Sequence, residues 1–390
     1  MKNKINTYLA RGVSPTKEDV QEAVKSHDAG LYPGAFCKII EDSYADKNYC
    51  VAMHADGAGT KSILAYIHYK ETGDSSLFKG IAQDSIVMNT DDLICTGFTN
   101  NFVLSNTIGR NAHRINGAIL KDLIQGYKDF ADTMQKYGVD ILLAGGETAD
   151  LGDLVPTIIV DSTIYARELR EKIIDCSKIK PGCVIVGLAS FGQAIYEQTY
   201  NSGIASNGFT AARHTLLSSK YMDKYPETYS STMNKDQIYR GKFMMEDKAD
   251  GMTQTVGEAL LSPTRTYIPV IAEILNSGIN SITGIIHSSG GGQVKCKNFG
   301  KNLHYIKDNL FEPPAIFKLI EKEGDMTPEE MYLVFNMGQR MEVYLAKEDA
   351  DKVISISKKY GIDAQIIGRV EKNANGNKVT IKRGNFVFEY

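Results

Sequence analysis

Residues 54–61 read His-Ala-Asp-Gly-Ala-Gly-Thr-Lys and directly follow the short apolar stretch Val51-Ala52-Met53. The apolar residues predict a β-strand, and Gly57 and Gly59 predict that this strand ends in a turn. Glycine adopts positive φ angles without steric cost and lets backbone amides approach a bound anion closely. The stretch therefore predicts a strand that feeds a turn suited to an anion.

Three side chains of this turn have the chemistry of a phosphate site. Thr60 and Lys61 offer a hydroxyl group and a cation to phosphate oxygens, and Asp56 offers a carboxylate of the kind that Mg²⁺ takes beside phosphates. The spacing GxxxxGK[ST] of a Walker A loop is absent, so any phosphate binding here has a different geometry. Taken alone, the stretch is better explained as a plain strand-to-helix turn.

Three acids lie on a helix predicted over residues 78–95. Apolar residues recur through this segment, and its polar face is expected to carry Asp84, Asp91 and Asp92. Asp84 and Asp91 are two helical turns apart, so both can share one face. A solvated acidic face is the simplest interpretation. The apolar neighbours indicate instead that parts of the segment are buried, and buried acids need a partner or a metal ion.

Three further segments combine glycine with polar residues. The strand predicted over 140–144 runs into Gly145-Gly146-Glu147, and the strand predicted around 283–287 runs into Ser288-Ser289-Gly290-Gly291-Gly292. Ser206-Asn207-Gly208 is either a ligand contact or a turn that enters a helix. Successive glycines cost conformational entropy, and either an anion cradle or a tight bend explains them. Each segment thus has a structural interpretation beside the functional one.

Strands and helices alternate along the chain, which predicts a mixed α and β protein. Its 390 residues exceed the size at which one hydrophobic core stays efficient, so two domains are expected, with a boundary near residue 168. Helices are predicted at 15–26 and, with clear amphipathic spacing, at 115–137. The polar stretch 214–250 is expected to be a loop-rich insertion on the surface.

The composition is that of an ordinary globular protein, with 43% hydrophobic and 23% charged residues. The net charge is −3 and charges of both signs are mixed along the chain, which gives little support to a nucleic-acid surface. The six cysteines form no CxxC pair and are expected to be buried reduced thiols. No signal peptide and no membrane helix is apparent, so a cytoplasmic location is expected.

The order of these motifs resembles aminoimidazole ribonucleotide synthetase, also called phosphoribosylformylglycinamidine cyclo-ligase. The similarity extends from about residue 28 to about residue 370. Each motif is weak alone, but eight of them in the family's order are a strong signal. In chain order they are Asp28-Ala29-Gly30, Asp56 to Lys61, Asp84 with Met88 and Asp92-Leu93, Gly145 to Ala149, Ser206 to Phe209, Leu261 to Tyr267, His287 with Gly290 to Gly292, and Met331 to Gly338.

The resemblance implies a reaction. ATP would phosphorylate the formyl-amide oxygen of formylglycinamidine ribonucleotide, the amidine nitrogen would attack the same carbon, and phosphate would leave as the imidazole ring closes. Phosphorylation turns a poor leaving group into a good one, and the transfer needs Mg²⁺ and hydrogen-bond donors to spread the charge. The implied cofactors are therefore ATP and Mg²⁺, with K⁺ as a further candidate.

The resemblance also implies roles for individual residues. Asp56, Asp84 and Asp92 would hold Mg²⁺. His287 would transfer a proton or orient the amide, and Lys61 and Asp56 would take part in catalysis with it. The other implied contacts are Gly57, Gly59, Thr60, Lys61, Gly145, Gly146 and Glu147 to the nucleotide, and Ser206, Asn207, Gly208, Gly290, Gly291 and Gly292 to the substrate.

The implied fold is α+β with two domains, of the PurM-like kind. Residues 1–168 would form the ATP-binding and dimerisation domain, whose mixed sheet builds a barrel at the interface of a homodimer. Residues 169–390 would form an α/β sandwich on the substrate side. The implied partners are a phosphorylated ribonucleotide and a second copy of the chain, without nucleic acid or membrane.

Five residues at four places depart from the family's usual pattern. Ala205 replaces a histidine, Asp91 replaces an asparagine, and Ser289 replaces a threonine. Gln339-Arg340 stands where the family continues with small residues. Ala205 and Arg340 bear most on substrate recognition, because both are expected beside the substrate and not beside the nucleotide.

Other members of the superfamily are alternatives. A selenophosphate synthetase-like protein would carry a reactive N-terminal cysteine loop, which is not evident here, and a thiamine monophosphate kinase-like protein would carry an earlier Asp-Asp pair than Asp91-Asp92. A non-catalytic, nucleotide-binding regulatory dimer would keep Asp56 and Lys61 and lose the substrate side. The stretches 193–204 and 218–250 also look longer than usual.

Overall fold

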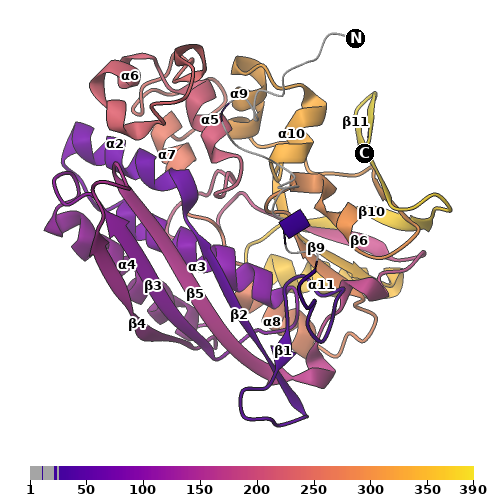
Figure 1. Cartoon of the computed structure of the whole chain (residues 1–390). Coiled ribbons are helices and arrows are strands. Elements are labelled where there is room, and N and C mark those ends of the chain that lie inside the picture. The colour runs from indigo at the N-terminus through magenta and orange to yellow at the C-terminus, as the bar shows by residue number, and fades with distance from the viewer. Residues whose placement is uncertain (1–10, 12–21, 24–25) are drawn as a thin grey trace.

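The computed structural model describes Arg11, Glu22, Ala23 and residues 26–390. Most of the helix expected at 15–26 lies outside these residues. The described chain folds into two parts that lie side by side, one around a five-stranded sheet and one around a seven-stranded sheet (Figure 1). The expectation of an α+β protein with mixed sheets is confirmed.

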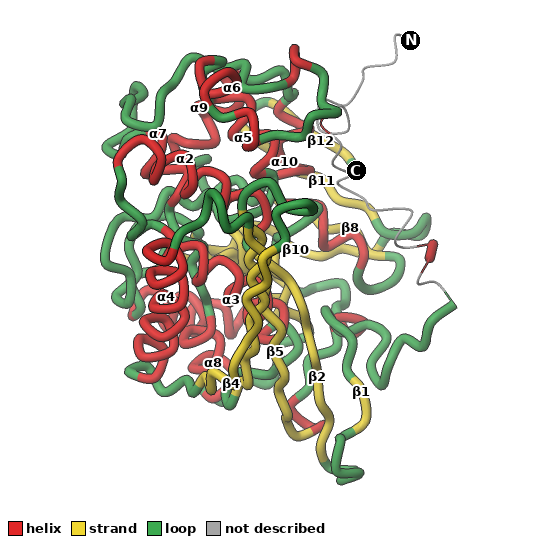
Figure 2. The backbone as a smooth tube through the Cα atoms, turned by 60° about the vertical axis from the view of Figure 1, so that its left-hand side comes forward, coloured by secondary structure: helices red, strands yellow, loops and turns green. Residues whose placement is uncertain are grey.

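The first sheet has the strand order β1-β2-β5-β3-β4, and only its β3–β4 pair is parallel. Its edges are β1 and β4, so the sheet is open in the single chain. Helices α3 and α4 lie together along one side of it (Figure 2). The bounds are β1 Ile40–Glu41, β2 Tyr49–Gly57, α2 Ser62–Thr72, α3 Phe78–Ile94, β3 Phe102–Arg110, α4 Gly117–Gln135, β4 Ile141–Asp150 and β5 Ile158–Leu169.

Side-chain alternation explains why helices cover only one face of this sheet. On β5, Val160 and Ile164 are buried, whereas Ile159 on the other face is 47% exposed. The outer face also carries Met53, which is 69% exposed, and Leu142, which is 64% exposed. Strands with period-two alternation bury one face against helices and leave the other for solvent or a partner.

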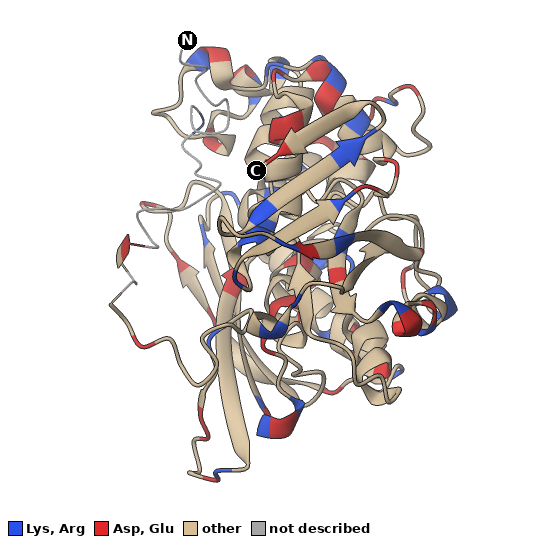
Figure 3. Cartoon of the chain, turned by 90° about the vertical axis from the view of Figure 1, so that its right-hand side faces the viewer, with Lys and Arg blue, Asp and Glu red and all other residues tan. Residues whose placement is uncertain are grey.

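The second sheet has the order β12-β11-β8-β10-β6-β9-β7, in which only β11–β8 is parallel. Lys and Arg are interspersed with Asp and Glu along the ribbon on this side of the molecule (Figure 3). The strands are β6 Val184–Ala189, β7 Gly284–His287, β8 Leu303–Lys307, β9 Gln339–Leu345, β10 Ala364–Lys372, β11 Lys378–Arg383 and β12 Phe386–Glu389. The helices are α5 Phe209–Leu216, α6 Lys220–Lys224, α7 Val256–Leu261, α8 Ile268–Asn276, α9 Ala315–Glu323, α10 Pro328–Val334 and α11 Ala350–Lys359.

Two local predictions were wrong. The strand predicted over 140–144 continues to Asp150, so Gly145 to Glu147 lie inside β4, beside a register shift against β3, and not in a turn. The stretch 214–250 is not simply a surface loop, because it contains short helices and buried Tyr221 and Tyr239. The acids of α3 are buried, as their apolar neighbours indicated, and the solvated acidic face that was the simpler interpretation is excluded. No helix in the described part of the chain is long and apolar enough to cross a bilayer.

Candidate active site

Helix α3 lies at the centre of the molecule and carries the three predicted acids into the contact between the two sheets. It contacts β2 and β5 on one side and α8 and β7 on the other. Asp84 and Asp91 are fully buried, and Asp92 is 9% exposed. Each acid has an identified basic partner, as the burial of a carboxylate requires.

Asp84 binds Lys61 from the predicted phosphate turn. The Lys61 ammonium lies 2.9 Å from Asp84 Oδ1 and donates to the carbonyl oxygen of Ser262 at 2.5 Å. Burial lowers the pKa of Lys61, and the charge of Asp84 opposes this shift. Thr264 donates its backbone amide and its hydroxyl to the same carboxylate oxygen, at 2.7 and 2.6 Å. Asp84 Oδ2 is buried without a hydrogen-bond partner among the described residues.

Thr264 also joins this cluster to the predicted substrate turn. Its hydroxyl oxygen lies 2.9 Å from the hydroxyl oxygen of Ser206. Gly208 is the N-cap of helix α5 with a φ of 75°, and a Cβ there would lie 2.4 Å from the Phe335 ring. Only glycine fits this close approach. The adjacent Asn207 has a buried Oδ1 without a partner in the described part of the chain, so this amide oxygen is placed to accept from a ligand.

Asp92 is the centre of a second cluster, which contains two histidines. Its Oδ1 lies 2.6 Å from His287 Nδ1, and its Oδ2 lies 3.3 Å from His54 Nε2. The other His54 nitrogen lies 2.9 Å from Asn89 Oδ1. Burial alone would raise the pKa of Asp92, but the hydrogen bonds from the two histidines outweigh it and hold this pKa well below its usual range.

The protonation of His54 follows from its two acceptors. Asn89 Nδ2 faces the carbonyl oxygens of Asp56, Ser85 and Ser162, which fixes Asn89 Oδ1 as the atom that faces His54. Both ring nitrogens of His54 must therefore donate. Burial would lower the pKa of His54, but the hydrogen bond and charge of Asp92 raise it above its ordinary value. His54 is thus a cation that holds Asp92 in its ionised form.

His287 is arranged differently, as a neutral imidazole. Burial, together with the charge of Arg340, lowers the pKa of His287 to about 4. Its Nδ1–H donates to Asp92, which leaves Nε2 without a proton. This Nε2 is buried and has no hydrogen-bond partner among the described residues. The arrangement presents an unprotonated nitrogen whose orientation is set by Asp92.

The three glycines after His287 form a turn that passes close to helix α10. Gly291 and Gly292 have φ angles of 91° and 51°. A Cβ on Gly292 would lie 2.5 Å from the carbonyl oxygen of Tyr332, so this position needs glycine, whereas Gly290 is exposed with open space around it. Lys295 donates to the Ser289 hydroxyl at 2.7 Å and brings a cation to the turn. Backbone and charge here suit an anion.

The predicted nucleotide contacts on β4 lie apart from the two clusters in the single chain, whereas Asp56 lies beside the second cluster, where its carbonyl oxygen accepts from Asn89 Nδ2 at 3.1 Å. Gly145, Gly146 and Glu147 are on the edge strand β4, which β5 and β3 separate from β2. Asp56 is exposed on β2, and its Oδ1 accepts from the Gly57 amide at 2.7 Å. Among the described residues, no group of three or more His, Cys, Asp and Glu side chains is arranged to hold a metal ion.

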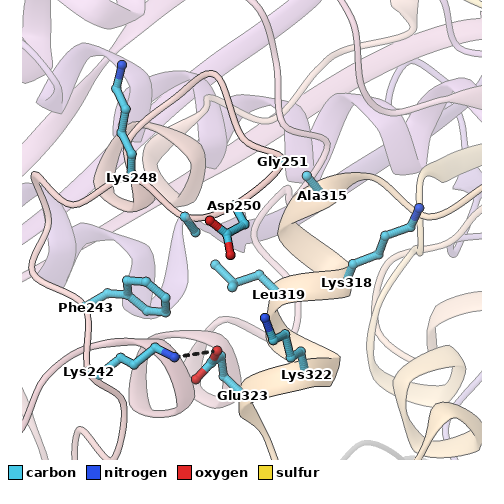
Figure 4. Close-up of a pocket in the computed structure, with 11 residues that line it drawn as sticks. Lys242, Phe243, Lys248, Asp250, Gly251, Ala315, Lys318, Leu319, Lys322 and Glu323 are labelled. Atoms are coloured by element: carbon cyan, nitrogen blue, oxygen red, sulfur yellow. Dashed lines mark hydrogen bonds and ion pairs between the residues drawn. The ribbon is translucent and has the colours of Figure 1, made fainter.

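A cavity of about 370 Å³ lies between the loop 242–251 and helix α9, away from all predicted residues. Figure 4 shows its charged lining, in which Lys242 is paired with Glu323 at 2.9 Å. Lysines and acids are both present, and its walls come only from the C-terminal part. The two clusters around α3 therefore remain the candidate site.

His54 and Asn89 were missed as site residues by sequence reasoning. A signal for Asn89 was present, because Ser85, Asn89 and Asp92 are spaced by four and three residues and so form one polar stripe on α3. The sequence pattern identifies His54 only as a residue at the end of a strand. Its role depends on the pairing of β2 with the helix behind it, which no local pattern reveals.

Comparison with known proteins agrees with this architecture. The N-terminal domain of AIR synthase related proteins matches residues 26–166, and the C-terminal domain of these proteins matches residues 180–380. The phosphoribosylformylglycinamidine cyclo-ligase of Methanocaldococcus jannaschii is 34% identical over 86% of this chain and 83% of its own length. The enzyme of the same name from Methanococcus maripaludis strain C7 is 31% identical over 98% of this chain and 97% of its own.

Solved structures share the fold at low sequence identity. The structure described as AaThiL complexed with AMPPCP and TMP has a TM-score of 0.52 and 12% identity, over 96% of this chain and 95% of that one. T. maritima PurL complexed with AMPPCP has a TM-score of 0.50 and 16% identity, over 98% of this chain and 49% of that one. With both domains matched and relatives above 30% identity over most of its length, this chain belongs to the AIR synthase related protein family.

Proposed function

We propose that the protein uses ATP to close the imidazole ring of formylglycinamidine ribonucleotide, giving aminoimidazole ribonucleotide, ADP and phosphate. Two relatives cited above bear the name of this cyclo-ligase, and each matches this chain over most of its own length. The observation in the chain itself that carries the proposal is the neutral His287, whose free Nε2 is aligned by Asp92. A ring closure needs such a proton acceptor beside an anion-binding turn.

The chemistry assigns work to both clusters. ATP transfers its γ-phosphoryl group to the formyl-amide oxygen, and the amidine nitrogen then attacks the activated carbon. In this proposal His287 Nε2 accepts the proton that the attacking nitrogen loses, and phosphate leaves with the former amide oxygen. Burial of the site keeps water away from the activated amide, which would otherwise hydrolyse.

The nucleotide is proposed to bind at the turn that ends β2. Gly57 and Gly59 give access to the backbone, and Thr60 offers a hydroxyl that now contacts the Thr210 hydroxyl at 3.2 Å. A Cβ at Gly57 would lie 2.8 Å from the backbone carbonyl oxygen of Val160, so a side chain is disfavoured there. Lys61 is held by Asp84 and would act through its charge on the phosphates. Gly145, Gly146 and Glu147 are proposed to contact the nucleotide from β4.

Mg²⁺ is the metal that the proposed reaction needs, and the acids of the site differ in what they can offer it. Asp84 Oδ2 is buried without a partner among the described residues, and Asp56 is exposed at the strand end. Both fit an ion that takes one or two carboxylates and completes its coordination with phosphates and water. Asp92 has both oxygens bound to histidines, so Asp56 and Asp84 are the better donors. The ion would neutralise phosphate charge during the transfer.

The substrate is proposed to bind between the two glycine turns of the C-terminal part. Asn207, beside Ser206 and Gly208, offers a buried amide oxygen to the polar substrate. The turn from Gly290 to Gly292 offers backbone groups and the nearby Lys295 cation to the ribose phosphate. The proposed contacts on this side thus include hydrogen-bond donors, an acceptor and a cation, which suit a phosphorylated ribonucleotide.

A homodimer is proposed through the open face of the first sheet. Met53, Leu142 and Ile159 are large apolar side chains exposed on this face, which is unusual for a solvated sheet. Packing two such faces together would build the barrel that the family resemblance implies. It would also place the β4 segment of one copy against the second copy.

A direct assay tests the proposed function. Purified protein is incubated with ATP, Mg²⁺ and K⁺, with and without formylglycinamidine ribonucleotide, and the aminoimidazole product is measured by diazotisation. Omission of each cation in turn tests the proposed cofactors.

A further inference from the structure

Asp91 and Arg340 are joined in one buried contact. Arg340 Nη2 lies 2.5 Å from Asp91 Oδ2, although the residues are 249 positions apart. Asp91 is fully buried and Arg340 is 1% exposed. The contact connects helix α3 of the N-terminal part with strand β9 of the C-terminal part.

Asp91 also holds the segment that follows helix α7. Its Oδ1 accepts from the Thr266 hydroxyl at 2.9 Å, and Arg340 Nη2 donates in addition to the carbonyl oxygen of Arg265. Two turns earlier on the same helix, Asp84 binds Thr264 of the same segment. Asp91 therefore completes a row of contacts by which α3 is fixed to the segment 262–267.

Arg340 has a second contact, made by its backbone. Its carbonyl oxygen accepts from the Ser288 amide at 2.7 Å, directly after His287, and His287 itself pairs with Met341 on β9. Its side chain meanwhile holds Asp91, directly before Asp92. One residue thus binds the chain neighbours of both members of the Asp92–His287 pair.

We propose that Asp91 and Arg340 are positioning residues that act together to set the alignment of Asp92 with His287. The proposal rests on the proposed function for its kinetic consequence, but the contact itself can be tested without substrate. The two residues form one buried ion pair whose charges compensate each other. Loss of either partner leaves a buried charge unpaired, whereas loss of both removes the charges together.

The kinetic test is a double-mutant cycle on the full-length protein. Asp91→Asn and Arg340→Met are each expected to lower kcat at least tenfold, while KM for ATP changes less than twofold, because the nucleotide turn is untouched. The double variant is expected to recover kcat to within fivefold of the wild type. Arg340→Lys, which keeps a cation opposite Asp91, is expected to retain more kcat than Arg340→Met and serves if the latter does not fold.

The control is a buried ion pair on the same strand. Glu342 and Lys307 are both fully buried and in contact within the second sheet. Glu342→Gln is expected to lower the melting temperature while kcat of the folded enzyme stays within twofold. This separates loss of stability from loss of alignment.

A spectroscopic measurement tests the alignment without substrate. In protein labelled with ¹⁵N-histidine, the His287 ring is expected to show a protonated Nδ1 and an unprotonated Nε2 in the wild type. These signals are expected to shift in both single variants and to return in the double variant. If the wild type lacks cyclo-ligase turnover but these signals behave as stated, the proposed function fails and the positioning role stands.

Two results would overturn the inference. In the first, the fold reduction of kcat in the double variant equals the product of the two single-variant reductions, which shows that the residues act independently. In the second, the single variants lower the melting temperature but keep wild-type kcat and wild-type His287 signals, which shows that the pair is merely structural.

Discussion

The carboxylate of Asp92 lies 2.6 Å from Nδ1 of His287 and joins helix α3 of the first part to strand β7 of the second. The second carboxylate oxygen lies 3.3 Å from the cationic His54. Asp92 is therefore ionised, and it sets both the orientation and the tautomer of His287. A free Nε2 results only when the two parts of the chain are correctly joined.

Replacement of this histidine tests its part in catalysis. His287→Ala is expected to lower kcat by about 10² to 10⁴, which is the usual contribution of a positioned acid or base. The matched control is His113→Ala, since His113 is exposed on a loop and is expected to retain full activity. Steady-state kinetics with circular dichroism checks both variants. A normal kcat in His287→Ala would exclude proton transfer by this residue.

The Lys61–Asp84 pair predicts a large effect on stability. Lys61→Met leaves the Asp84 carboxylate buried without its cation, which costs about 3 to 5 kcal/mol in free energy of unfolding. The double variant Lys61→Met, Asp84→Asn is expected to be less destabilised, because no charge remains. Urea denaturation at neutral pH measures both.

An exposed pair provides the comparison for this measurement. Lys79 and Asp129 lie 2.9 Å apart with both side chains more than 40% exposed, so Lys79→Met is expected to cost at most about 1 kcal/mol. Equal costs for Lys61→Met and Lys79→Met would show that the Lys61 contact is not formed in the folded protein.

Much of the fold could be predicted from periodic patterns. The helix expected at 115–137 is α4, with bounds Gly117–Gln135, because five apolar residues recur at helical spacing and Asn116 caps its start. The strand expected around 283–287 is β7, with bounds Gly284–His287. Local patterns were sufficient here because α4 buries one continuous face and β7 is buried along its whole length.

Pairings between distant residues could not be predicted. Gly145 looked like a strand end, but β4 continues because β3 beside it runs on to Arg110 and supplies hydrogen bonds. Likewise, Asp91 and Arg340 were recognised only as separate departures. Their contact depends on how α3 packs against β9, which is a property of the whole fold.

Buried His214 predicts a loss of stability in acid. Burial, with repulsion from Arg213 and Arg11, lowers the pKa of His214 to about 2, whereas an unfolded histidine titrates near pH 6.5. Between these values the unfolded chain binds the extra proton, so folding stability falls as the pH is lowered from about 6.5. Above pH 7 this group contributes no pH dependence.

The variant His214→Asn isolates this effect. In the wild type His214 Nδ1 accepts a hydrogen bond from the Tyr239 amide at 3.1 Å. An asparagine side chain can accept the same hydrogen bond but takes up no proton. Its free energy of unfolding between pH 4 and 6 is expected to fall less steeply than that of the wild type, by up to about 1.4 kcal/mol per pH unit. Urea denaturation across this range measures the difference. Parallel curves for the two proteins would contradict the assignment.

The open sheet face predicts a dimer that one charge disrupts. Leu142→Glu is expected to give a monomer in sedimentation velocity, because a carboxylate buried in an apolar interface is left unpaired. Ile124→Glu is the control, since Ile124 is 54% exposed on α4 and is expected to leave the dimer intact. A Leu142→Glu variant that stays dimeric would place the interface elsewhere.

The assignment as a cyclo-ligase is tested most directly by coupled measurement of ATP consumption and aminoimidazole formation. With Mg²⁺ and K⁺ present, we expect ATP to be consumed only when formylglycinamidine ribonucleotide is added, with ADP, phosphate and the diazotisable product formed in equal amounts. Asp56→Asn is expected to abolish nearly all of this turnover while the fold is kept. Absence of the aminoimidazole product, or ATP consumption that does not depend on the substrate, would contradict the account.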